Sequence, residues 1–169
     1  MRQIWKFLYW PVVWIITLYV PYCFTPGPWR ALGGVTGILL RVAGLLVLAY
    51  SMLLTSIGGR TLRLYAHKGG GGFWPDKLFV EGVYGCMRHP QHLGLALFPL
   101  GLALLAASPA AVLGSGWSVS AALLFVLLAE EPECLRKYGE EYYKYMMRTP
   151  SFTLDPRCLA RGIRFLRRG

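Results

Sequence analysis

The chain alternates long apolar runs with polar breaks, and the runs have the length of membrane spans. A transmembrane helix needs about 20 predominantly apolar residues. Runs of roughly this length lie at residues 4–24, 32–57, 91–107 and 110–129. The pattern therefore predicts an all-α fold. It also predicts that this fold is an integral membrane bundle of four transmembrane helices. We expect the whole chain, 1–169, to form a single domain with a tail at 130–169.

The breaks between the runs differ in length and content. Ser108 and Pro109 form a tight break, which predicts a helical hairpin from the third and fourth runs. Gly33 and Gly37, four residues apart in the second run, are a weak indication of close approach by a neighbouring helix. The four glycines at 69–72 are interpreted as a flexible hinge, because the strand, helix and Lys-Ser/Thr of a phosphate-binding loop are missing.

Positive charges mark one side of the predicted membrane. Cytoplasmic loops of membrane proteins carry an excess of Lys and Arg. Arg2 and Lys6 open the chain, five basic residues follow the second run, and nine more follow the fourth run. The opposite side carries Arg30 alone. The charges predict a multi-pass protein of the cell membrane with both termini in the cytoplasm.

Composition favours a membrane setting over other classes. The chain is 55% hydrophobic and 15% charged, whereas soluble domains are about 25% charged. The net charge of +10 resembles that of nucleic-acid binders, but the basic residues lie between and after the apolar runs, so we expect no nucleic acid. The four cysteines form no CxxC pair and predict no metal site. Three of them fall on the predicted cytoplasmic side, which argues against disulfides.

One charge, Arg41, lies inside the second run. A charge at membrane depth is by default a hypothesis for function. Arg41 is therefore a candidate substrate residue that would clamp a carboxylate. The alternative is that it snorkels to the interface or pairs with a polar group of the bundle.

The first polar cluster lies directly before the third run, where residues 88–94 read Arg-His-Pro-Gln-His-Leu-Gly. Pro90 suits the first turn of a helix, because its missing N–H needs no partner there. A helix N-terminus offers free N–H groups to a carboxylate. The alternative is an interfacial anchor, in which Arg88 and the histidines meet lipid headgroups.

The second polar cluster, Glu130-Glu131-Pro132-Glu133, directly follows the fourth run. Acidic residues at a helix C-terminus oppose the helix dipole and face an anionic leaflet. Such a position requires a partner. A bound cation is one candidate, since S-adenosylmethionine carries a sulfonium and an ammonium. A salt bridge to Arg88 or Arg136 is the other.

The tail contains two further patterns. Tyr138, Tyr142 and Tyr145 share one helical face, which packs on the bundle or walls a cofactor pocket. Four arginines from Arg157 to Arg168 follow helical spacing beside an apolar stripe at 159, 163 and 166. This arrangement predicts a cytoplasmic amphipathic helix lying on an anionic leaflet.

Together these clusters resemble a known family. The segment 88–94, preceded by Gly82-Val83-Tyr84, resembles the signature of isoprenylcysteine carboxyl methyltransferases and phospholipid N-methyltransferases. The Glu130-Glu131 pair and the residues 138–145 resemble the ending of that signature. His92 replaces the usual Tyr and Tyr138 the usual Phe, and Pro132 is unexpected. The resemblance covers about residues 75–150.

The resemblance implies S-adenosylmethionine as cofactor and methyl transfer to a membrane lipid or lipidated substrate. The acceptor would be an isoprenylcysteine carboxylate or a phospholipid amine at the cytoplasmic interface. By position, the cofactor-binding residues would be Tyr84, Arg88, His89, Pro90, Gln91, Leu93, Gly94, Glu130 and Glu131.

As catalytic residues we expect Arg88, His89, His92 and Glu131. An amine acceptor would need a base, whereas a carboxylate would not. The oligomeric state stays open. Two alternatives are an NADPH-dependent membrane reductase of the sterol-reductase type and a non-catalytic lipid-binding membrane module.

Overall fold

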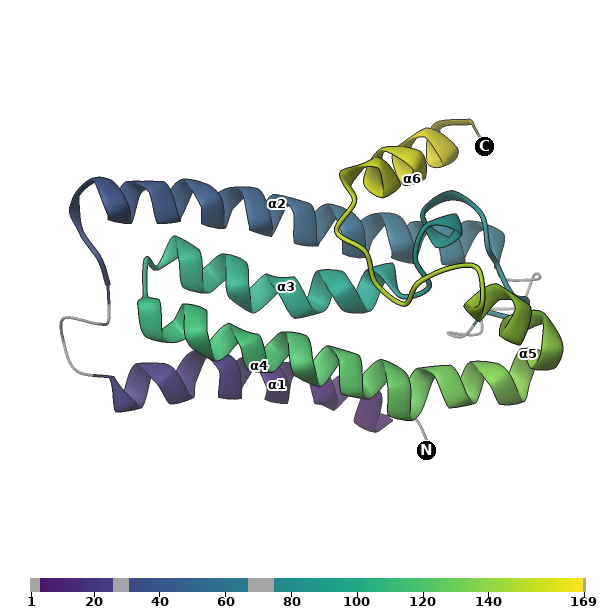
Figure 1. Ribbon diagram of the computed structural model, residues 1–169, viewed down its shortest axis with the longest axis horizontal. Coiled ribbons are helices and arrows are strands. Elements are labelled where there is room, and N and C mark those ends of the chain that lie inside the picture. The colour runs from purple at the N-terminus through teal and green to yellow at the C-terminus, as the bar shows by residue number, and fades with distance from the viewer. Residues whose placement is uncertain (1–3, 26–30, 67–74, 169) are drawn as a thin grey trace. The chain divides into compact units, whose positions relative to one another are not determined.

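The computed structural model describes residues 4–25, 31–66 and 75–168. Its elements, in chain order, are α1 (Ile4–Phe24), α2 (Gly34–Tyr65), the 3-10 turn η2 (Gly82–Gly85), α3 (Pro90–Leu105), α4 (Pro109–Phe125), the π-turn η3 (Val126–Glu130), α5 (Glu131–Met146) and α6 (Pro156–Arg168) (Figure 1). The described residues contain no strand, so the all-α prediction is confirmed. The glycines at 69–72 lie outside the described residues.

Among the described residues, two helices are long and apolar enough to cross a membrane. They are α2 and the continuous helical run Pro109–Met146. The apolar part Leu8–Pro21 of α1 and the helix α3 are shorter. The structure therefore supports two spans by length and composition, and the four-span bundle stays a prediction.

The chain divides into two compact units. Unit 1 contains residues 1–52 and 94–123, and unit 2 contains residues 53–93 and 124–169. In unit 1, α1 lies beside both α3 and α4. The Tyr9 hydroxyl donates to the Ala121 carbonyl over 2.7 Å, and the rings of Trp14 and Phe98 stack with centroids 4.8 Å apart.

The close approach of α2 and α3 in unit 1 depends on two glycines. A Cβ on Gly44 would stand 2.5 Å from the backbone nitrogen of Leu105, and the carbonyl oxygen of Gly101 would be 2.9 Å away. By contrast, a Cβ at Gly33 would meet no described atom within 4 Å. The contact of α2 with α3 forms two turns further along α2 than the Gly33 and Gly37 pair, and a helix contact at that pair stays a prediction.

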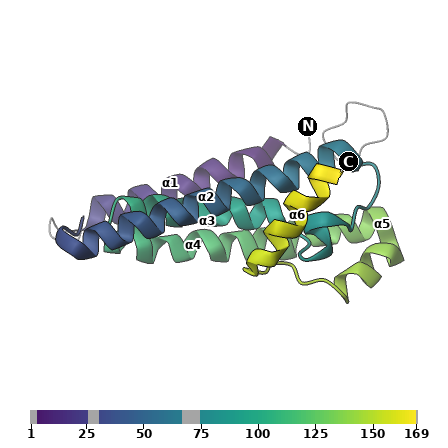
Figure 2. The ribbon, with the colours of Figure 1, turned by 90° about the horizontal axis from the view of Figure 1, so that it is seen from above.

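In unit 2, the C-terminal helix α6 packs on the turn η2 (Figure 2). Gly162 is the point of closest contact, since a Cβ there would stand 2.7 Å from Ile57 Cγ2 and 3.0 Å from Val83 Cβ. The ring of Phe165 covers Gly82 and lies 5.0 Å from that of Tyr65, between centroids. The side of α6 that carries Gly162 and Phe165 is therefore part of the core of unit 2.

The helix that begins at Pro109 does not end at the glutamate pair. The backbone N–H of Glu131 donates to the Val126 carbonyl, five residues back, and the helix continues into α5. The expectation of a helix C-terminus at Glu130 is wrong, because good helix formers follow the apolar run. Pro132 has no N–H to donate, so one backbone hydrogen bond of the helix is missing there. The adjacent π-turn accommodates the missing bond by a local change in the helical hydrogen-bond pattern.

Candidate functional site

Hydrogen bonds with residues of α2 and α5 hold the turn η2 in place within unit 2. Tyr84 is buried, and its hydroxyl donates to the Gly58 carbonyl over 3.3 Å. The Tyr84 carbonyl accepts a hydrogen bond of 2.5 Å from the Tyr145 hydroxyl. Gly82 begins the turn at φ +60°, a conformation that favours glycine. The turn therefore holds the start of segment 88–94 between the ends of α2 and α5.

Arg88 is the centre of the hydrogen-bond network in unit 2. Its Nε donates to Glu131 Oε1 over 3.1 Å, and its Nη2 donates to the same oxygen and, over 2.6 Å, to Ser151 Oγ. Its Nη1 donates to the carbonyls of Met146 and Thr149. The side chains of Arg88 and Glu131 are 8% and 7% exposed. The salt bridge considered as an alternative at the sequence level is thus present, and it is buried.

Backbone hydrogen bonds at Arg88 and His89 also connect the start of α3 to the segment after α5. The N–H of Arg88 donates to the Pro150 carbonyl over 3.0 Å, and the N–H of His89 donates to the Ser151 carbonyl over 3.1 Å. Ser151 Oγ also donates to Glu131 Oε1 over 2.8 Å. The segment between α5 and α6 is therefore an integral part of the site. No sequence pattern indicated a role for Ser151, because a lone serine after a helix belongs to no recognisable motif.

His89 is buried beside a phenol and a carboxylate. Its Nε2 lies 3.3 Å from the Tyr142 hydroxyl and 3.6 Å from Glu131 Oε1. Its ring lies 5.6 Å from that of His92, and the His92 ring lies 5.3 Å from that of Phe125. A proton on Nε2 would face the carboxylate, and without a proton this nitrogen accepts from the phenol. The arrangement can therefore accept and hold a proton.

The electrostatics of Glu131 follow from these contacts. The residue lies beyond the apolar run that ends at Ala129. Burial alone raises the pKa of its carboxyl, but hydrogen bonds from His89, Arg88 and Ser151 and the charge of Arg88 outweigh burial and lower it from 4.5 to about 2. Glu131 is thus ionised at neutral pH. This suits an ion-pair partner better than a base.

The first turn of α3 lies against two adjacent glycines of α2. The helix begins at Pro90, as the sequence predicted. A Cβ on Gly58 would stand 2.8 Å from Gln91 Cγ and 3.2 Å from Pro90 Cγ. A Cβ on Gly59 would stand 2.9 Å from Gln91 Nε2. Sequence reasoning missed this role, although the Gly58-Gly59 pair directly after an apolar run was a visible signal.

Two of the candidate residues belong to unit 1. Gly94 is buried, and its carbonyl accepts from the Ser51 hydroxyl over 2.7 Å. Arg41 is exposed, and its Nη1 lies 2.9 Å from where a Cβ on Gly37 would stand. Leu93, by contrast, is buried within unit 2. The exposure of Arg41 near the start of α2 fits the snorkelling alternative.

The tyrosine stripe of α5 is split between two roles. Tyr142 and Tyr145 are buried against His89 and η2, so they form one wall of the site. Burial raises the pKa of the Tyr142 phenol, which keeps it protonated at neutral pH. Tyr138 is half-buried and donates to the Pro75 carbonyl over 2.9 Å. Gly139 lies between Tyr138 and Tyr142. Its backbone has φ +57° and ψ −131°, and α5 kinks at this residue.

A family model described as phospholipid methyltransferase matches residues 34–141, more than half of the chain. The chain belongs to the phospholipid methyltransferase family. Comparison with curated proteins and with solved structures gave no match. The phospholipid methyltransferase match contains every residue of the site from Tyr84 to Glu131. It ends before Tyr142, Ser151 and α6, which complete the network in this protein.

Membership in the phospholipid methyltransferase family confirms the resemblance that the two polar clusters suggested. It indicates a membrane enzyme that methylates lipids. The buried network of unit 2 is where polar and titratable side chains of the matched segment come together, through the Arg88–Glu131 ion pair and its contact with His89.

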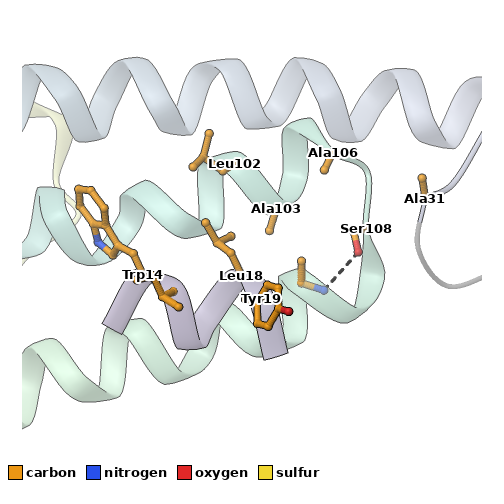
Figure 3. Close-up of a pocket in the computed structure, with 10 residues that line it drawn as sticks. Trp14, Leu18, Tyr19, Ala31, Leu102, Ala103, Ala106 and Ser108 are labelled. Carbon is orange, nitrogen blue, oxygen red and sulfur yellow. Dashed lines mark hydrogen bonds between the residues drawn. The ribbon is translucent and has the colours of Figure 1, made fainter. Parts of the chain in front are cut away.

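Unit 1 contains an apolar cavity of about 770 Å³ (Figure 3). Its lining comes from α1, the segment before α2, α3 and the start of α4, and includes Leu18, Leu102, Ala103 and Ala106. Trp14 also lines it, and its indole N–H donates to the Leu95 carbonyl over 3.0 Å. The described lining residues carry no carboxylate, imidazole or amine. The cavity therefore suits a hydrocarbon chain better than a polar headgroup.

Proposed function

We propose that this protein transfers a methyl group from S-adenosylmethionine to the amine of a phospholipid headgroup at the cytoplasmic membrane interface. The observation that carries the proposal is the buried ion pair between Arg88 and Glu131. It joins the two polar clusters of the family-matched segment in one unit. The family match favours a phospholipid amine over an isoprenylcysteine carboxylate.

The acidic side chains of unit 2 fit a cationic cofactor. Glu130 and Glu131 are both buried, and both lie in the segment that the family model matches. Carboxylates are the side chains that suit the ammonium and sulfonium of S-adenosylmethionine. By resemblance, Tyr84, the segment 88–94 and the glutamate pair would hold the cofactor. When bound, it would supply an activated methyl group for displacement by a nucleophile.

The residues of the site would prepare the acceptor. A protonated headgroup amine has no free electron pair, so a base must take its proton before attack. We assign this role to His89. A proton gained at Nε2 would be stabilised by the Glu131 carboxylate 3.6 Å away. The Tyr142 hydroxyl, 3.3 Å from Nε2, would hold the imidazole in place. Arg88 would act by fixing Glu131 rather than by touching the acceptor.

We further propose a four-span topology with both termini in the cytoplasm. The polar clusters then meet the inner interface, which a water-soluble cofactor reaches from the cytoplasm. The apolar cavity of unit 1 would accommodate a lipid hydrocarbon chain.

The test uses purified protein in phosphatidylcholine nanodiscs that contain phosphatidylethanolamine. Binding of S-adenosylhomocysteine is measured by calorimetry, and N-methylated lipid is measured by mass spectrometry. We expect His89→Gln to lower the rate by 10²–10³-fold with cofactor binding retained, in line with the loss of a general base. Lys144→Gln, which breaks an exposed ion pair with Glu140, is the matched control and should be neutral.

Other outcomes separate the alternatives. An alkali-labile methyl ester on a prenylcysteine substrate, with no N-methylated lipid, would identify the carboxylate acceptor. Absence of S-adenosylhomocysteine binding in folded protein would refute the proposal. Binding of NADPH in that case would favour the reductase.

A further inference from the structure

The C-terminal helix α6 packs one of its sides inside unit 2. Cys158 is 4% exposed and Gly162 is buried against Ile57 and Val83. Phe165 contacts Tyr65 and Phe79, with ring centroids 5.0 Å and 5.7 Å away. The most deeply packed positions of α6 meet η2 and α2, which fixes the rotation of the helix. They lie beside the predicted apolar stripe at 159, 163 and 166, whose residues are half-buried. That this stripe lies on the leaflet stays a prediction.

This rotation leaves an arginine face exposed. Arg157, Arg161, Arg164 and Arg168 recur at intervals of four, three and four residues, and all four are exposed. These four residues, called here the α6 arginine face, lie about a third of a turn around the helix from Cys158 and Gly162. Arg161 also donates to Cys86 Sγ over 3.7 Å.

Among the described residues, no acidic side chain forms an ion pair with the α6 arginine face. The ion pairs of unit 2, at Arg88, His89 and Lys144, include none of the four arginines. The carboxylate of Asp155 is occupied at the start of α6, where Oδ1 accepts from the N–H of Arg157 over 2.9 Å. Arg60 and Arg63 near the end of α2 are also exposed and add positive charge to the same unit.

We propose that the α6 arginine face binds the anionic phospholipid headgroups of the leaflet beside it. A guanidinium presents paired donors that match phosphate oxygens. Clustered arginines beside a membrane surface each strengthen binding to anionic lipid by about fivefold. The proposed binding is electrostatic, through the guanidinium groups, rather than by insertion. It rests on the membrane placement of the family and does not depend on methyl transfer.

The consequence is a physical link between the leaflet and the site. The helix α6 packs on η2, which carries Tyr84 and precedes Arg88. A leaflet that holds α6 by its arginines therefore also holds the turn on which the site is built. Nothing in this link requires cofactor or acceptor to be present.

The experiment titrates full-length protein in neutral detergent micelles with dioctanoyl phosphatidylglycerol, dioctanoyl phosphatidylcholine or inorganic phosphate. Bound lipid is counted by native mass spectrometry, and affinity is measured by thermophoresis at 50 and 300 mM salt. The test variant is Arg157→Gln/Arg164→Gln/Arg168→Gln, which leaves the packed side of α6 intact. The matched control on and after α5, Arg136→Gln/Lys144→Gln/Arg148→Gln, removes the same charge from other exposed residues.

We expect the α6 variant to bind phosphatidylglycerol on the order of 100-fold more weakly than wild type, from three arginines at about fivefold each. The control variant should lose less than tenfold, and wild-type binding should weaken as salt is raised. Equal losses in both variants would overturn the proposal in favour of net charge. Equal affinity for phosphatidylcholine would overturn it in favour of insertion, and tighter binding of inorganic phosphate alone would overturn it in favour of a free anion. Thermal unfolding of both variants checks that the fold is retained.

Discussion

Removal of Arg88 tests whether the network of unit 2 holds the fold together. In Arg88→Ala, the Glu131 carboxylate would stay buried with Ser151 and His89 as its remaining partners. The carbonyls of Met146 and Thr149 would also lose a donor. The substitution therefore disconnects the segment after α5 from the start of α3.

The magnitude can be worked out in two ways. Breaking a buried ion pair by removing one partner costs about 3–5 kcal/mol, and both side chains here are less than a tenth exposed. Independently, the fall of the Glu131 pKa from 4.5 to about 2 corresponds to roughly 3 kcal/mol of preferential stabilisation of the carboxylate. Ser151 and His89 supply part of that stabilisation. We therefore expect a loss of about 3 kcal/mol in the free energy of unfolding.

The assay is thermal unfolding in detergent, followed by tryptophan fluorescence and calorimetry. For a chain of this size, about 3 kcal/mol lowers Tm by roughly 6–12 °C. Replacement of both partners, in Arg88→Met/Glu131→Leu, should be milder than Arg88→Ala because no charge is left buried without its partner. Lys144→Gln breaks an exposed pair and should cost under about 1 kcal/mol.

The pH dependence gives an independent check with a definite sign. The pKa of Glu131 is lower in the folded state, so its stabilisation is fully present above about pH 4.5 and is lost as pH falls towards 2. The gap in stability between wild type and Glu131→Gln should therefore shrink over that range. A gap that stays constant with pH, or an Arg88→Ala protein within 1 kcal/mol of wild type, would refute the reasoning.

Further predictions concern glycines. Gly139→Ala should cost about 1–3 kcal/mol through backbone strain alone, since its φ is +57° and a Cβ there would meet open space. Gly116→Ala, also in open space but within regular helix, should be neutral or stabilising by up to about 1 kcal/mol, and equal effects at the two sites would contradict the strain argument. Gly162→Ala should cost about 1–3 kcal/mol by overpacking, because its Cβ would clash with Ile57 and Val83. Thermal unfolding measures all three, and an unchanged Tm for Gly162→Ala would show that α6 does not depend on this contact.

Features with a local cause could be predicted from the sequence. The first helix has the predicted bounds, and α3 begins at Pro90, because apolar runs and proline act through their own segment of backbone. The family was also visible, since its motifs are short runs of adjacent residues. In the same way, the spacing of Tyr142 and Tyr145 placed both on one helical face, and the structure buries both.

Features that depend on distant partners could not be predicted. The continuation of the helix past Glu130 was missed because a change from apolar to charged residues marks the end of a membrane span, whereas the helix itself ends only where its backbone hydrogen bonds do. The role of Ser151 was missed because it depends on a contact with Arg88, 63 positions earlier in the chain.

The sequence by itself therefore determined the helices, the membrane character and the family, because these follow from hydrophobic period, span length and motif. Only the tertiary structure decided that Glu131 pairs with Arg88 and that Tyr142 contacts His89. It also decided that α6 turns its arginines outward. The reason is physical: periodicity tells which face of a helix is apolar, but only packing against other elements decides which surface that face covers and which charges remain exposed.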